Sequence, residues 1–397
     1  MRSIKDADLK GKRVLLRVDF NVPTDEEGNI IDDSKMRAAL PTIEYILNNG
    51  ARLIVMSHLG RPKGKINEKY SLKKVAFHLG QMLDSKVIMA QDCIGPKVEE
   101  AVRRLQPGEI LLLENVRFYP GEEKNDSEFS RQLASLAEIY VNDAFGTAHR
   151  AHASTAGVAD YLPAYAGFLM EKEVEMLRKA LEHPEKPRIA ILGGAKVSDK
   201  IKLIDNLLTR VDVILIGGGM ANTFLKAEGF EIGKSICEND LLEEARGLLK
   251  LAENRNVQIL LPVDVVVTDE ISENGLCDIK NVNNIPPDYI IADIGPETVK
   301  LFCQNISQAR TIVWNGPLGI YEYKKFSSGT NHVAHAVAES NAVSVVGGGD
   351  LTAAIYKLGL ENKITHVSTG GGATMEFLEG RILPGVAACE GKGVLQR

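Results

Sequence analysis

The chain has 397 residues, of which 25% are charged and 44% hydrophobic, and its formal net charge is −6. This length suffices for roughly two or three domains, and the acidic balance argues against a nucleic-acid-binding or membrane-surface protein. No apolar run approaches membrane-spanning length, residues 1–13 are too charged for a signal peptide, and the five cysteines are widely spaced. We therefore expect a cytoplasmic protein with reduced thiols, no nucleic-acid partner and no membrane contact.

In the first half, short apolar runs alternate with amphipathic stretches. Each apolar run turns abruptly polar at its C-terminal end, and the runs with these ends span 14–23, 52–64, 109–125 and 138–152. Helical patterns lie between them, for example at 72–83 and 129–137. This alternation predicts a parallel sheet with helices on both faces, and ligands bind such sheets at the carboxyl ends of the strands.

Basic and polar side chains gather at these predicted strand ends. They are Arg17, Asp19, Asn21, His58, Arg61, Arg117, His149, Arg150 and His152. One arginine after a strand is most often a solvated surface charge, but several on one edge of an acidic chain indicate a pocket. Because guanidinium groups pair bidentately with phosphate and carboxylate, we expect a small anion there.

A single amphipathic helix is predicted over 168–181. Its apolar residues recur on one face, and His183-Pro184 ends it just before a new strand opens. We interpret this break as a domain boundary with the helix as the connection. The expected division is a domain at 1–167, the connecting helix at 168–182, a second domain at 183–383 and a tail at 384–397. For the tail, the residues leave open a disordered end or a strap across another part of the molecule.

The second half repeats the alternation, with glycine at the strand ends. In the stretch 188–200, an apolar run breaks at a glycine pair, and an amphipathic run resumes after Lys200. We interpret it as strand, turn and helix, with Lys196 and Lys200 on one face of the first helical turn, where an anion is favoured. An ordinary βα turn is the alternative. Neither a Walker A loop nor G-x-G-x-x-G is present here.

Further glycine runs follow the other predicted strands. The runs fall within 191–196, 211–222, 311–322, 342–350 and 366–374. Close packing of helix on sheet could explain any one of them, whereas several along one edge favour backbone approach to a large flat or phosphorylated ligand. Asp350 could hold a magnesium ion that bridges to phosphate, or could be an N-cap. Glu322 could bind ribose hydroxyls, or could be an exposed acid at a helix start.

These stretches together resemble the phosphoglycerate kinase family over essentially the whole chain. The motifs that carry the resemblance are RVDFNVP, SHLGRPKG, LLLENVRFYPGEEKN, VNDAFGTAHRAH, GGAKVSDK, IGGGMA, VWNGPLGIYE, GGGD and STGGGA. The resemblance implies an α/β protein of two doubly wound, Rossmann-like parallel-sheet domains, joined by a helix and separated by a cleft. It also implies that the first domain binds 3-phosphoglycerate or 1,3-bisphosphoglycerate, the second binds ATP or ADP with Mg²⁺, and the tail folds back onto the first.

The resemblance also implies roles for individual residues. The substrate-binding positions are Arg17, Asp19, Asn21, Lys35, His58, Leu59, Gly60, Arg61, Arg117, His149 and Arg150. The nucleotide-binding positions are Gly194, Lys200, Gly217, Gly218, Asn315, Glu322, Gly348, Gly349, Asp350, Leu351 and Thr352, with Asp350 also the magnesium ligand. The catalytic positions are Lys196, Lys35, Gly349 and Gly372.

Two residues depart from the family pattern. Leu351 replaces a serine or threonine, so a hydroxyl contact would have to come from Thr352. Lys35 replaces an arginine, and Arg37 is the obvious candidate to compensate. The residues from 34 onward nevertheless form a helical pattern despite Pro41, so Arg37 should face away from Lys35.

The residue inventory agrees with phosphoryl transfer. A site rich in arginine, lysine and glycine turns suits positioning and charge neutralisation, and a carboxylate acceptor needs no general base. We therefore expect a monomeric glycolytic kinase that transfers a phosphoryl group in line between 1,3-bisphosphoglycerate and ADP after domain closure. A nicotinamide dehydrogenase and a non-catalytic nucleotide-binding protein are the alternatives.

Overall fold

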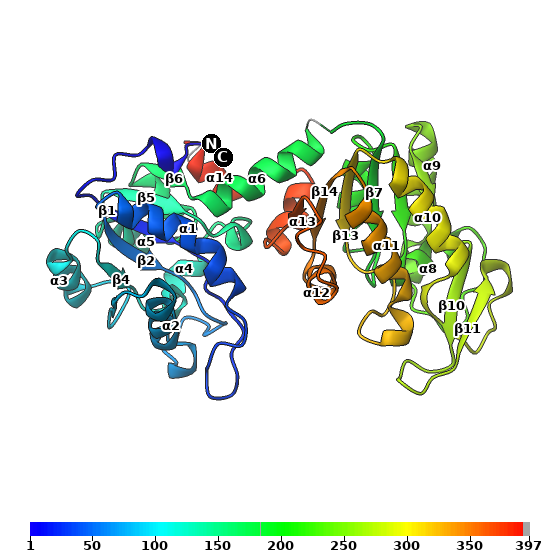
Figure 1. The fold of residues 1–397 in the computed structure, drawn as a ribbon, viewed down its shortest axis with the longest axis horizontal. Coiled ribbons are helices and arrows are strands. Elements are labelled where there is room, and N and C mark those ends of the chain that lie inside the picture. Colours follow the sequence, from blue (N-terminus) through cyan, green and yellow to red (C-terminus); the bar gives the residue numbers. More distant parts are fainter. Residues whose placement is uncertain (183, 392–397) are drawn as a thin grey trace. The chain divides into compact units, whose positions relative to one another are not determined.

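The computed structural model describes residues 1–182 and 184–391. The chain forms two compact units (Figure 1). Unit 1 is Met1–Glu175 with Ile382–Arg397, of which 392–397 lie outside the described residues, and unit 2 is Met176–Arg381. Each unit contains a six-stranded parallel sheet, so the predicted α/β class with two parallel sheets is confirmed.

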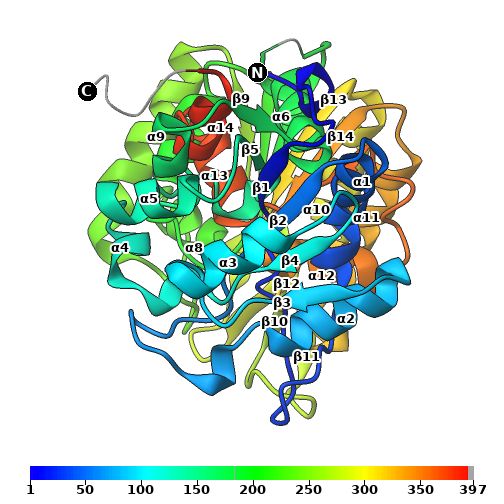
Figure 2. The same ribbon diagram turned by 90° about the vertical axis from the view of Figure 1, so that its left-hand side faces the viewer.

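Unit 1 is built on one parallel sheet, and Figure 2 labels most of its strands. The strands in spatial order are β3 (Val87–Met89), β4 (Ile110–Leu112), β2 (Arg52–Met56), β1 (Arg13–Arg17), β5 (Ile139–Asn142) and β6 (Ala164–Ala166). Along β1, Val14 and Leu16 belong to one apolar cluster and Leu15 to another. This alternation follows from the strand period of two, and it explains why helices cover both faces.

The helices of unit 1 pack on both faces of this sheet. They are α1 (Ser34–Asn48), α2 (Lys73–Leu83), α3 (Pro96–Arg104), α4 (Pro120–Glu123), α5 (Ser127–Ala134) and α14 (Pro384–Cys389), and α6 (Phe168–Leu181) starts in this unit. Short 3₁₀ helices are η1 (Ile4–Asp6), η2 (Glu68–Tyr70), η3 (Val116–Phe118), η4 (Phe145–Thr147) and η5 (Gly157–Asp160). The helix predicted at 129–137 spans Ser127–Ala134 instead. It starts earlier because the Asp126 side chain accepts a hydrogen bond from Phe129 N and caps it.

The C-terminal helix α14 packs within unit 1. Gly385 N donates to Ala148 O at 2.8 Å, and Arg2 N donates to Cys389 O at 2.9 Å. The described part of the segment after Leu383 is therefore an ordered helix on this unit. Residues 392–397 of the predicted tail, and His183 at the predicted end of α6, lie outside the described residues.

Unit 2 contains a second parallel sheet and a smaller antiparallel one. The parallel strands in spatial order are β15 (His366–Val367), β14 (Val343–Gly347), β13 (Thr311–Asn315), β7 (Arg188–Leu192), β8 (Val213–Ile216) and β9 (Gln258–Leu260). The antiparallel strands are β11 (Cys277–Asn281), β10 (Asp264–Thr268) and β12 (Ile290–Ile294). The alternating pattern did not predict this antiparallel sheet.

Helices surround the parallel sheet of unit 2. They are α7 (Ile201–Leu207), α8 (Gly218–Ala227), α9 (Leu242–Asn254), α10 (Pro296–Gln308), α11 (Ser328–Glu339), α12 (Gly349–Lys357) and α13 (Gly372–Leu378), with η6 (Asn239–Leu241), η7 (Val282–Asn284) and η8 (Lys324–Phe326). The core between β13, α10 and α11 contains Trp314, Phe302 and Val333, all fully buried. Trp314 is the only tryptophan of the chain.

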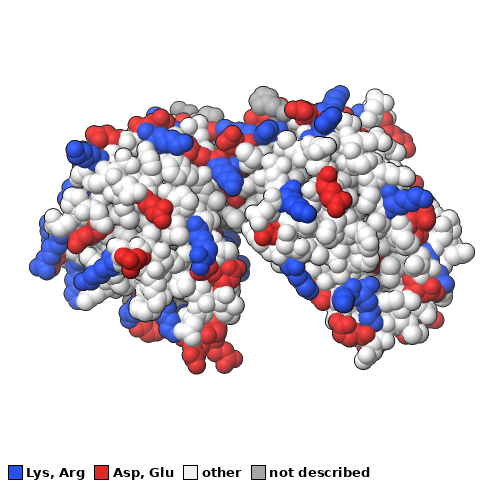
Figure 3. All heavy atoms as spheres, in the orientation of Figure 1, with Lys and Arg blue, Asp and Glu red and all other residues white. Residues whose placement is uncertain are grey.

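The surface carries charges of both signs. Figure 3 shows basic and acidic side chains interspersed over the face that it draws. Within the described parts of the chain, no helix combines the length and the apolar composition that crossing a membrane would require.

Candidate active site

The carboxyl ends of the strands of unit 1 bring basic side chains together. Arg17, the last residue of β1, is fully buried, and its Nε donates to Ser154 Oγ at 2.7 Å. Its Nη2 lies 3.3 Å from Nδ1 of His58, which follows β2. The parallel register places these ends at one edge of the sheet, so residues far apart in sequence meet there.

Arg117, in η3 after β4, is a second buried arginine of this cluster. Its Nη1 donates to Gly60 O at 2.9 Å, whereas its buried Nη2 has no hydrogen-bond partner. Burial, together with the nearby Arg150, lowers the pKa of Arg117 to about 10. A buried guanidinium with an unused donor is costly unless an anion completes its hydrogen bonds, so this position suits an anionic ligand.

Asp19 connects the arginines to α1. Its Oδ2 lies 2.9 Å from Lys35 Nζ, and its Oδ1 lies 3.9 Å from Nδ1 of His58. Burial holds the pKa of His58 well below 6.5, so the imidazole is neutral at neutral pH. Burial would raise the pKa of Asp19, but the facing groups, of which Lys35 and Arg17 are cationic, hold it below its usual range.

The loop after β2 shapes the rest of this edge. Asn21 Oδ1 accepts a hydrogen bond from Gly60 N at 2.8 Å, and Leu59 O accepts one from Asn115 Nδ2 at 2.7 Å. Arg61 is exposed in this loop. The structure therefore brings Asn21, Leu59 and Gly60 into the cluster but leaves Arg61 at its outside.

The turn after β5 brings His149 and Arg150 to the same sheet edge. Arg150 Nε donates to His149 Nε2 at 3.2 Å, and both side chains are partly exposed. The nearby His152 is neutral at neutral pH, because burial and the neighbouring arginines lower its pKa to about 3. Arg150 therefore contributes a positive charge to this turn, whereas His152 does not.

Two residues that the sequence reasoning missed hold this turn in place. Glu122 is fully buried, and its two carboxylate oxygens accept from Ser154 N at 2.9 Å and Ser154 Oγ at 2.6 Å. Burial raises the pKa of Glu122, although Arg17 and these hydrogen bonds oppose the shift. Glu122 belongs to the motif LLLENVRFYPGEEKN, but no local sequence pattern indicates that it pairs with Ser154, which is 32 residues away.

In unit 2, the glycine turns after β7, β8 and β13 are joined by their backbones. Gly194 N donates to Pro317 O and Gly218 N donates to Leu318 O, both at 2.9 Å. Gly218 has φ +65°, and a Cβ atom there would lie 2.8 Å from Gly194 N. Close packing thus explains part of the glycine pattern, whereas a Cβ at Gly349 would meet nothing within 4 Å. The open position at Gly349 has room for a ligand to approach its backbone.

The predicted placement of Lys196 and Lys200 on one helical turn is wrong. Helix α7 begins at Ile201, so Lys196 lies in a loop and Lys200 is the N-cap. The loop follows its own contacts: Val197 is buried, and Ser198 N and Oγ donate to Glu238 at 2.9 and 2.6 Å. These contacts draw the chain away from a helical path.

The two lysines have different environments. Lys196 is exposed, whereas Lys200 is buried with its Nζ against Asn315 Oδ1 and 3.7 Å from Met375 Sδ. Asn315 also donates from Nδ2 to Gly347 O at 2.9 Å. Burial lowers the pKa of Lys200 to about 8. An anionic ligand would raise this pKa again and favour the charged form of the lysine.

The glycine run after β14 opens α12. Its N-cap is Gly348, with φ +101°, so the alternative that Asp350 is the N-cap is wrong. Asp350 instead lies exposed in the first turn of the helix. Leu351 is fully buried in the core, and the Oγ1 of Thr352 is buried without a hydrogen-bond partner. Thr352 can therefore offer a hydroxyl that Leu351 cannot. After β15, Gly372 opens α13 in the same way.

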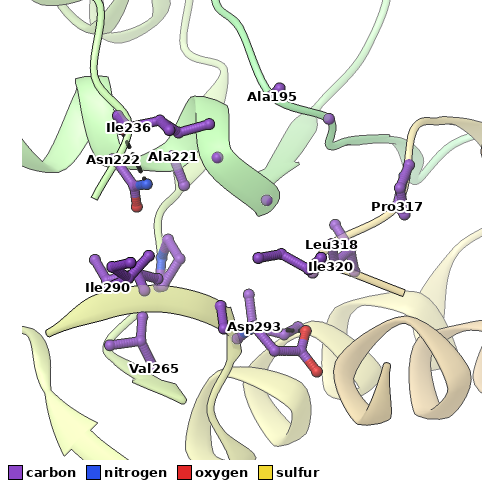
Figure 4. Close-up of a pocket in the computed structure, with 18 of the residues that line it drawn as sticks. Ala195, Ala221, Asn222, Ile236, Val265, Ile290, Asp293, Pro317, Leu318 and Ile320 are labelled. Atoms are coloured by element: carbon purple, nitrogen blue, oxygen red, sulfur yellow. Dashed lines mark hydrogen bonds between the residues drawn. The ribbon is translucent and has the colours of Figure 1, made fainter. Parts of the chain in front are cut away.

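A cavity of about 240 Å³ lies within unit 2 (Figure 4). Its lining includes the predicted residues Gly194, Gly218, Glu322 and Asp350, and apolar side chains such as Ile236 form much of the remainder. Glu322 lies in a turn before η8, so it is not at a helix start. The cavity combines glycine turns, carboxylates and an apolar wall.

Comparison with known proteins identifies the family. A profile described as phosphoglycerate kinase matches residues 4–381. The chain belongs to the phosphoglycerate kinase family. It is similar to the phosphoglycerate kinase of Moorella thermoacetica, with 57% identity over 386 residues that cover 97% of this chain and 98% of that protein. The phosphoglycerate kinase of Dictyoglomus turgidum is 57% identical over 390 residues, which are 98% of both proteins.

Solved phosphoglycerate kinase structures share the fold. The structure from Coxiella burnetii matches with a TM-score of 0.91 and 45% identity, over 98% of this chain and 99% of that chain. The structure from Pyrococcus horikoshii matches with a TM-score of 0.82 and 36% identity, over 99% of both chains. The sequence-based resemblance to phosphoglycerate kinase is therefore confirmed, in place of the nicotinamide dehydrogenase alternative.

Membership of the phosphoglycerate kinase family assigns the reaction. The enzyme interconverts 1,3-bisphosphoglycerate plus ADP and 3-phosphoglycerate plus ATP, and the family uses the magnesium nucleotide. Among the described residues, no group of three or more His, Cys, Asp or Glu side chains gathers to hold a metal. Mg²⁺ is commonly bound through one or two carboxylates together with substrate phosphates, so the exposed Asp350 at the cavity fits this ion.

Proposed function

We propose that the two units divide the substrates of the phosphoglycerate kinase reaction between them. Unit 1 binds 3-phosphoglycerate or 1,3-bisphosphoglycerate at its basic cluster, and unit 2 binds ADP or ATP in its cavity. The observation that carries this division is the buried Nη2 of Arg117, which has no partner within the described residues. An anion that fills this position would remove the cost of an unsatisfied charged donor.

The basic cluster binds the phosphoglycerate through charge and hydrogen bonds. Arg117, Arg150 and Arg61 supply guanidinium groups for phosphate and carboxylate oxygens, and His149 adds a polar group beside Arg150. Arg17, Asp19, Asn21, His58, Leu59 and Gly60 form the wall that orients the substrate. Arg17 Nε donates to Ser154 and its Nη2 contacts His58. We therefore assign Arg17 mainly to holding this wall in place.

The cavity of unit 2 binds the nucleotide. Gly217 and Gly218 lie under the base, Glu322 binds the ribose, and Gly194, Asn315 and Lys200 bind the phosphates. Gly348, Gly349 and the hydroxyl of Thr352 form the phosphate turn of α12, with Leu351 supporting it from the core. Asp350 holds Mg²⁺, which neutralises phosphate charge when it is bound.

The catalytic groups act by neutralising charge during direct, in-line transfer. The acceptor in the ATP-consuming direction is a carboxylate that is already ionised at neutral pH, so no general base is needed. Lys35 of unit 1 and Lys196 of unit 2 would each neutralise charge on the transferring phosphoryl group, and the turns at Gly349 and Gly372 add backbone donors at helix starts.

Transfer requires the two units to approach, because reacting atoms must come within about 3–3.5 Å of each other. Closure should need both ligands, since each unit holds one of them. Small-angle scattering should therefore show contraction with 3-phosphoglycerate plus magnesium nucleotide and little with either alone. Equal contraction with nucleotide alone would contradict the division.

A coupled assay tests the function directly. The protein with 1,3-bisphosphoglycerate and Mg-ADP should form ATP, and omission of Mg²⁺ should abolish the signal. We place the enzyme in the cytoplasm as a monomer. Absence of ATP formation by a correctly folded sample would contradict the proposal.

A further inference from the structure

The buried carboxylate of Glu122 joins two segments that carry arginines of the basic cluster. Glu122 lies in α4, directly after η3, which contains Arg117. Its two carboxylate oxygens accept from Ser154 N at 2.9 Å and Ser154 Oγ at 2.6 Å, and its carbonyl oxygen accepts from Ala153 N at 2.9 Å. Ser154 follows Arg150 by four residues. These bonds, the Glu122–Ser154 clamp, therefore fix the segment of Arg150 against the segment of Arg117.

The clamp opposes a repulsion between these two arginines. Arg117 is 4% exposed, and burial together with the like charge of Arg150 lowers its pKa. Like charges in a poorly solvated site repel each other until an anion is placed between them. A phosphate group needs both guanidinium groups near their final separation before it binds, so a rigid connection between the two segments preorganises the site.

The hydrogen bonds of Ser154 require two accepting oxygens at position 122. The Ser154 N–H can only donate, and the Ser154 hydroxyl already accepts from Arg17 Nε at 2.7 Å, so its own proton points to Glu122. An amide has one oxygen, so it would break one of the two bonds. An ionised carboxylate keeps both.

Glu122 is also a counter-charge for the buried cations. Arg17 is fully buried, and the Ser154 hydroxyl connects it to Glu122. Burial raises the pKa of Glu122, and Arg17, the hydrogen bonds from Ser154 and Arg117 oppose this rise. His152 Nδ1 lies 3.7 Å from Glu122 Oε1, but His152 is neutral at neutral pH. Removal of the Glu122 charge would therefore leave buried arginine charge less well compensated.

We infer that Glu122 is a positioning residue for the phosphoglycerate. Through Ser154 it holds Arg117 and Arg150 at the separation that the anion requires. The inference rests on the proposed function, because it requires the phosphoglycerate to bind at the basic cluster. Loss of the clamp should weaken the binding of 3-phosphoglycerate and leave nucleotide binding unchanged, since the cavity of unit 2 is lined by residues of unit 2.

The first experiment breaks the clamp from each side. Glu122→Gln keeps the size of the side chain, and Ser154→Ala removes the hydroxyl but keeps the backbone N–H. In titration calorimetry, each variant should bind 3-phosphoglycerate roughly tenfold more weakly and Mg-ADP within about twofold of the unmodified enzyme. Circular-dichroism melting would show that the samples are folded, and Ser154→Ala decides the question if Glu122→Gln does not fold. An affinity for 3-phosphoglycerate within about twofold in Ser154→Ala would overturn the inference.

Glu123→Gln is the matched control for charge. Glu123 is adjacent to Glu122, its Oε1 lies 3.4 Å from Arg117 Nε, and its side chain is 51% exposed. This variant removes one negative charge from the same helix and leaves the bonds to Ser154 intact, so 3-phosphoglycerate affinity should stay within about twofold. Equal weakening by Glu122→Gln and Glu123→Gln would assign the effect to net charge and would overturn the role of the clamp.

A double variant tests whether the clamp acts on the two arginines. Arg150→Ala removes one of them, so Glu122→Gln should weaken 3-phosphoglycerate binding much less in that background than in the unmodified enzyme. The combined loss of affinity should therefore be clearly smaller than the product of the two single losses. A combined loss equal to that product would mean that Glu122 acts independently of Arg150, and the inference would be wrong.

Arg117→Met separates this inference from the proposed function. It should weaken 3-phosphoglycerate binding strongly if the anion completes the hydrogen bonds of this guanidinium. Unchanged binding would mean that the phosphoglycerate lies elsewhere, and both the proposed function of the basic cluster and the role of Glu122 would fall. Weakened binding in Arg117→Met with unchanged binding in Glu122→Gln and Ser154→Ala would overturn the role of Glu122 alone.

Discussion

The Nζ atom of Lys35 lies 2.9 Å from Oδ2 of Asp19, in the wall of the basic cluster. Arg37, two residues further along α1, turns away: its Nε and Nη2 both lie 2.8 Å from the carboxylate of Asp33. The Arg37 side chain is 67% exposed. Residues two apart point about 200° apart around a helix, and α1 keeps helical geometry past Pro41, so both orientations follow from helix geometry.

Lys35 should therefore matter to catalysis and Arg37 should not. We expect Lys35→Ala to lower kcat by about 10²-fold, because it removes a charge from the site of transfer. Lys35→Arg should keep or raise kcat, since a planar guanidinium can hold two oxygens where an ammonium offers one compact charge. Steady-state kinetics with 3-phosphoglycerate and Mg-ATP would measure both.

Arg37→Ala is the matched control for this series. Its exposed pair with Asp33 contributes little, so kcat and KM should stay within about twofold of the unmodified enzyme. If Arg37→Ala lowered kcat strongly and Lys35→Ala lowered it only slightly, the catalytic charge would come from the guanidinium of Arg37 and not from the ammonium of Lys35.

Much of the fold followed from local patterns. Val14, Leu15 and Leu16 alternate between two apolar clusters, as a strand buried on both faces requires. The continuous apolar run in the sequence predicts such a strand. The helical period predicted α1, α2 and α6 closely. Strand ends in a parallel sheet share an edge, so the convergence of Arg17 and His58 was predictable too.

The remainder depends on contacts between distant residues. The loop after β7 leaves the helical path because Ser198 pairs with Glu238, which is 40 residues away, and no local pattern encodes that pair.

Lys200 should make ADP binding depend on pH. Burial lowers the pKa of Lys200 to about 8 in the free enzyme, and a bound phosphate favours the charged form. As the pH rises, Lys200 therefore loses its proton at a lower pH in the free enzyme than in the ADP complex. ADP affinity should then fall above about pH 8, by at most about tenfold per pH unit. Calorimetric titrations between pH 7 and 9.5 would measure this decline.

Two variants test the assignment of that decline. Lys200→Met should bind ADP weakly without the inflection near pH 8, whereas Lys196→Ala should keep it, because Lys196 is exposed in the loop. Persistence of the inflection in Lys200→Met would assign the titration to another group.

Asp293 should make unit 2 less stable as the pH rises from about 4 to about 7. Burial raises the pKa of Asp293 to about 7, although hydrogen bonds from Gly329 N and Ile294 N oppose the shift. The unfolded carboxyl ionises near its ordinary value of 3.8, so between these pH values the folded state retains a proton that the unfolded state has lost. The favourable contribution is complete below pH 3.8 and declines by about 4 kcal/mol by pH 7.

Asp293→Asn cannot titrate, so its free energy of unfolding should fall less over this interval. Urea titrations followed by the fluorescence of the buried Trp314 would report on unit 2. Asp278→Asn is the control of opposite sign, because hydrogen bonds from Lys280 and from Ile279 N hold the pKa of Asp278 below its usual range. Above pH 4, the free energy of unfolding of Asp278→Asn should change with pH in parallel with that of the unmodified protein. Parallel curves for Asp293→Asn as well would contradict the prediction.

Glu238 should support catalysis through the loop that carries Lys196. Both of its carboxylate oxygens accept from Ser198, and its own N–H donates to Thr223 Oγ1 at 3.2 Å. Glu238 thereby ties the loop to α8, the helix that lines the nucleotide cavity. Lys196→Ala should lower kcat by 10²–10³-fold, as loss of one electrostatic donor typically does, with ADP affinity little changed. Glu238→Ala should lower kcat by roughly tenfold, because a mobile loop presents the same charge less often.

The double variant decides whether Glu238 acts only by placing Lys196. If it does, Glu238→Ala should cost almost nothing once Lys196 is alanine, so the two losses should be strongly non-additive in ln kcat. Glu238→Gln, which keeps one accepting oxygen, should lie between Glu238→Ala and the unmodified enzyme, and Glu228→Ala, an exposed glutamate at the end of α8, should have no effect. If the loss of kcat in the double variant equals the product of the two single losses, Glu238 contributes independently of Lys196. The proposed role of Glu238 in positioning the Lys196 loop would then be wrong.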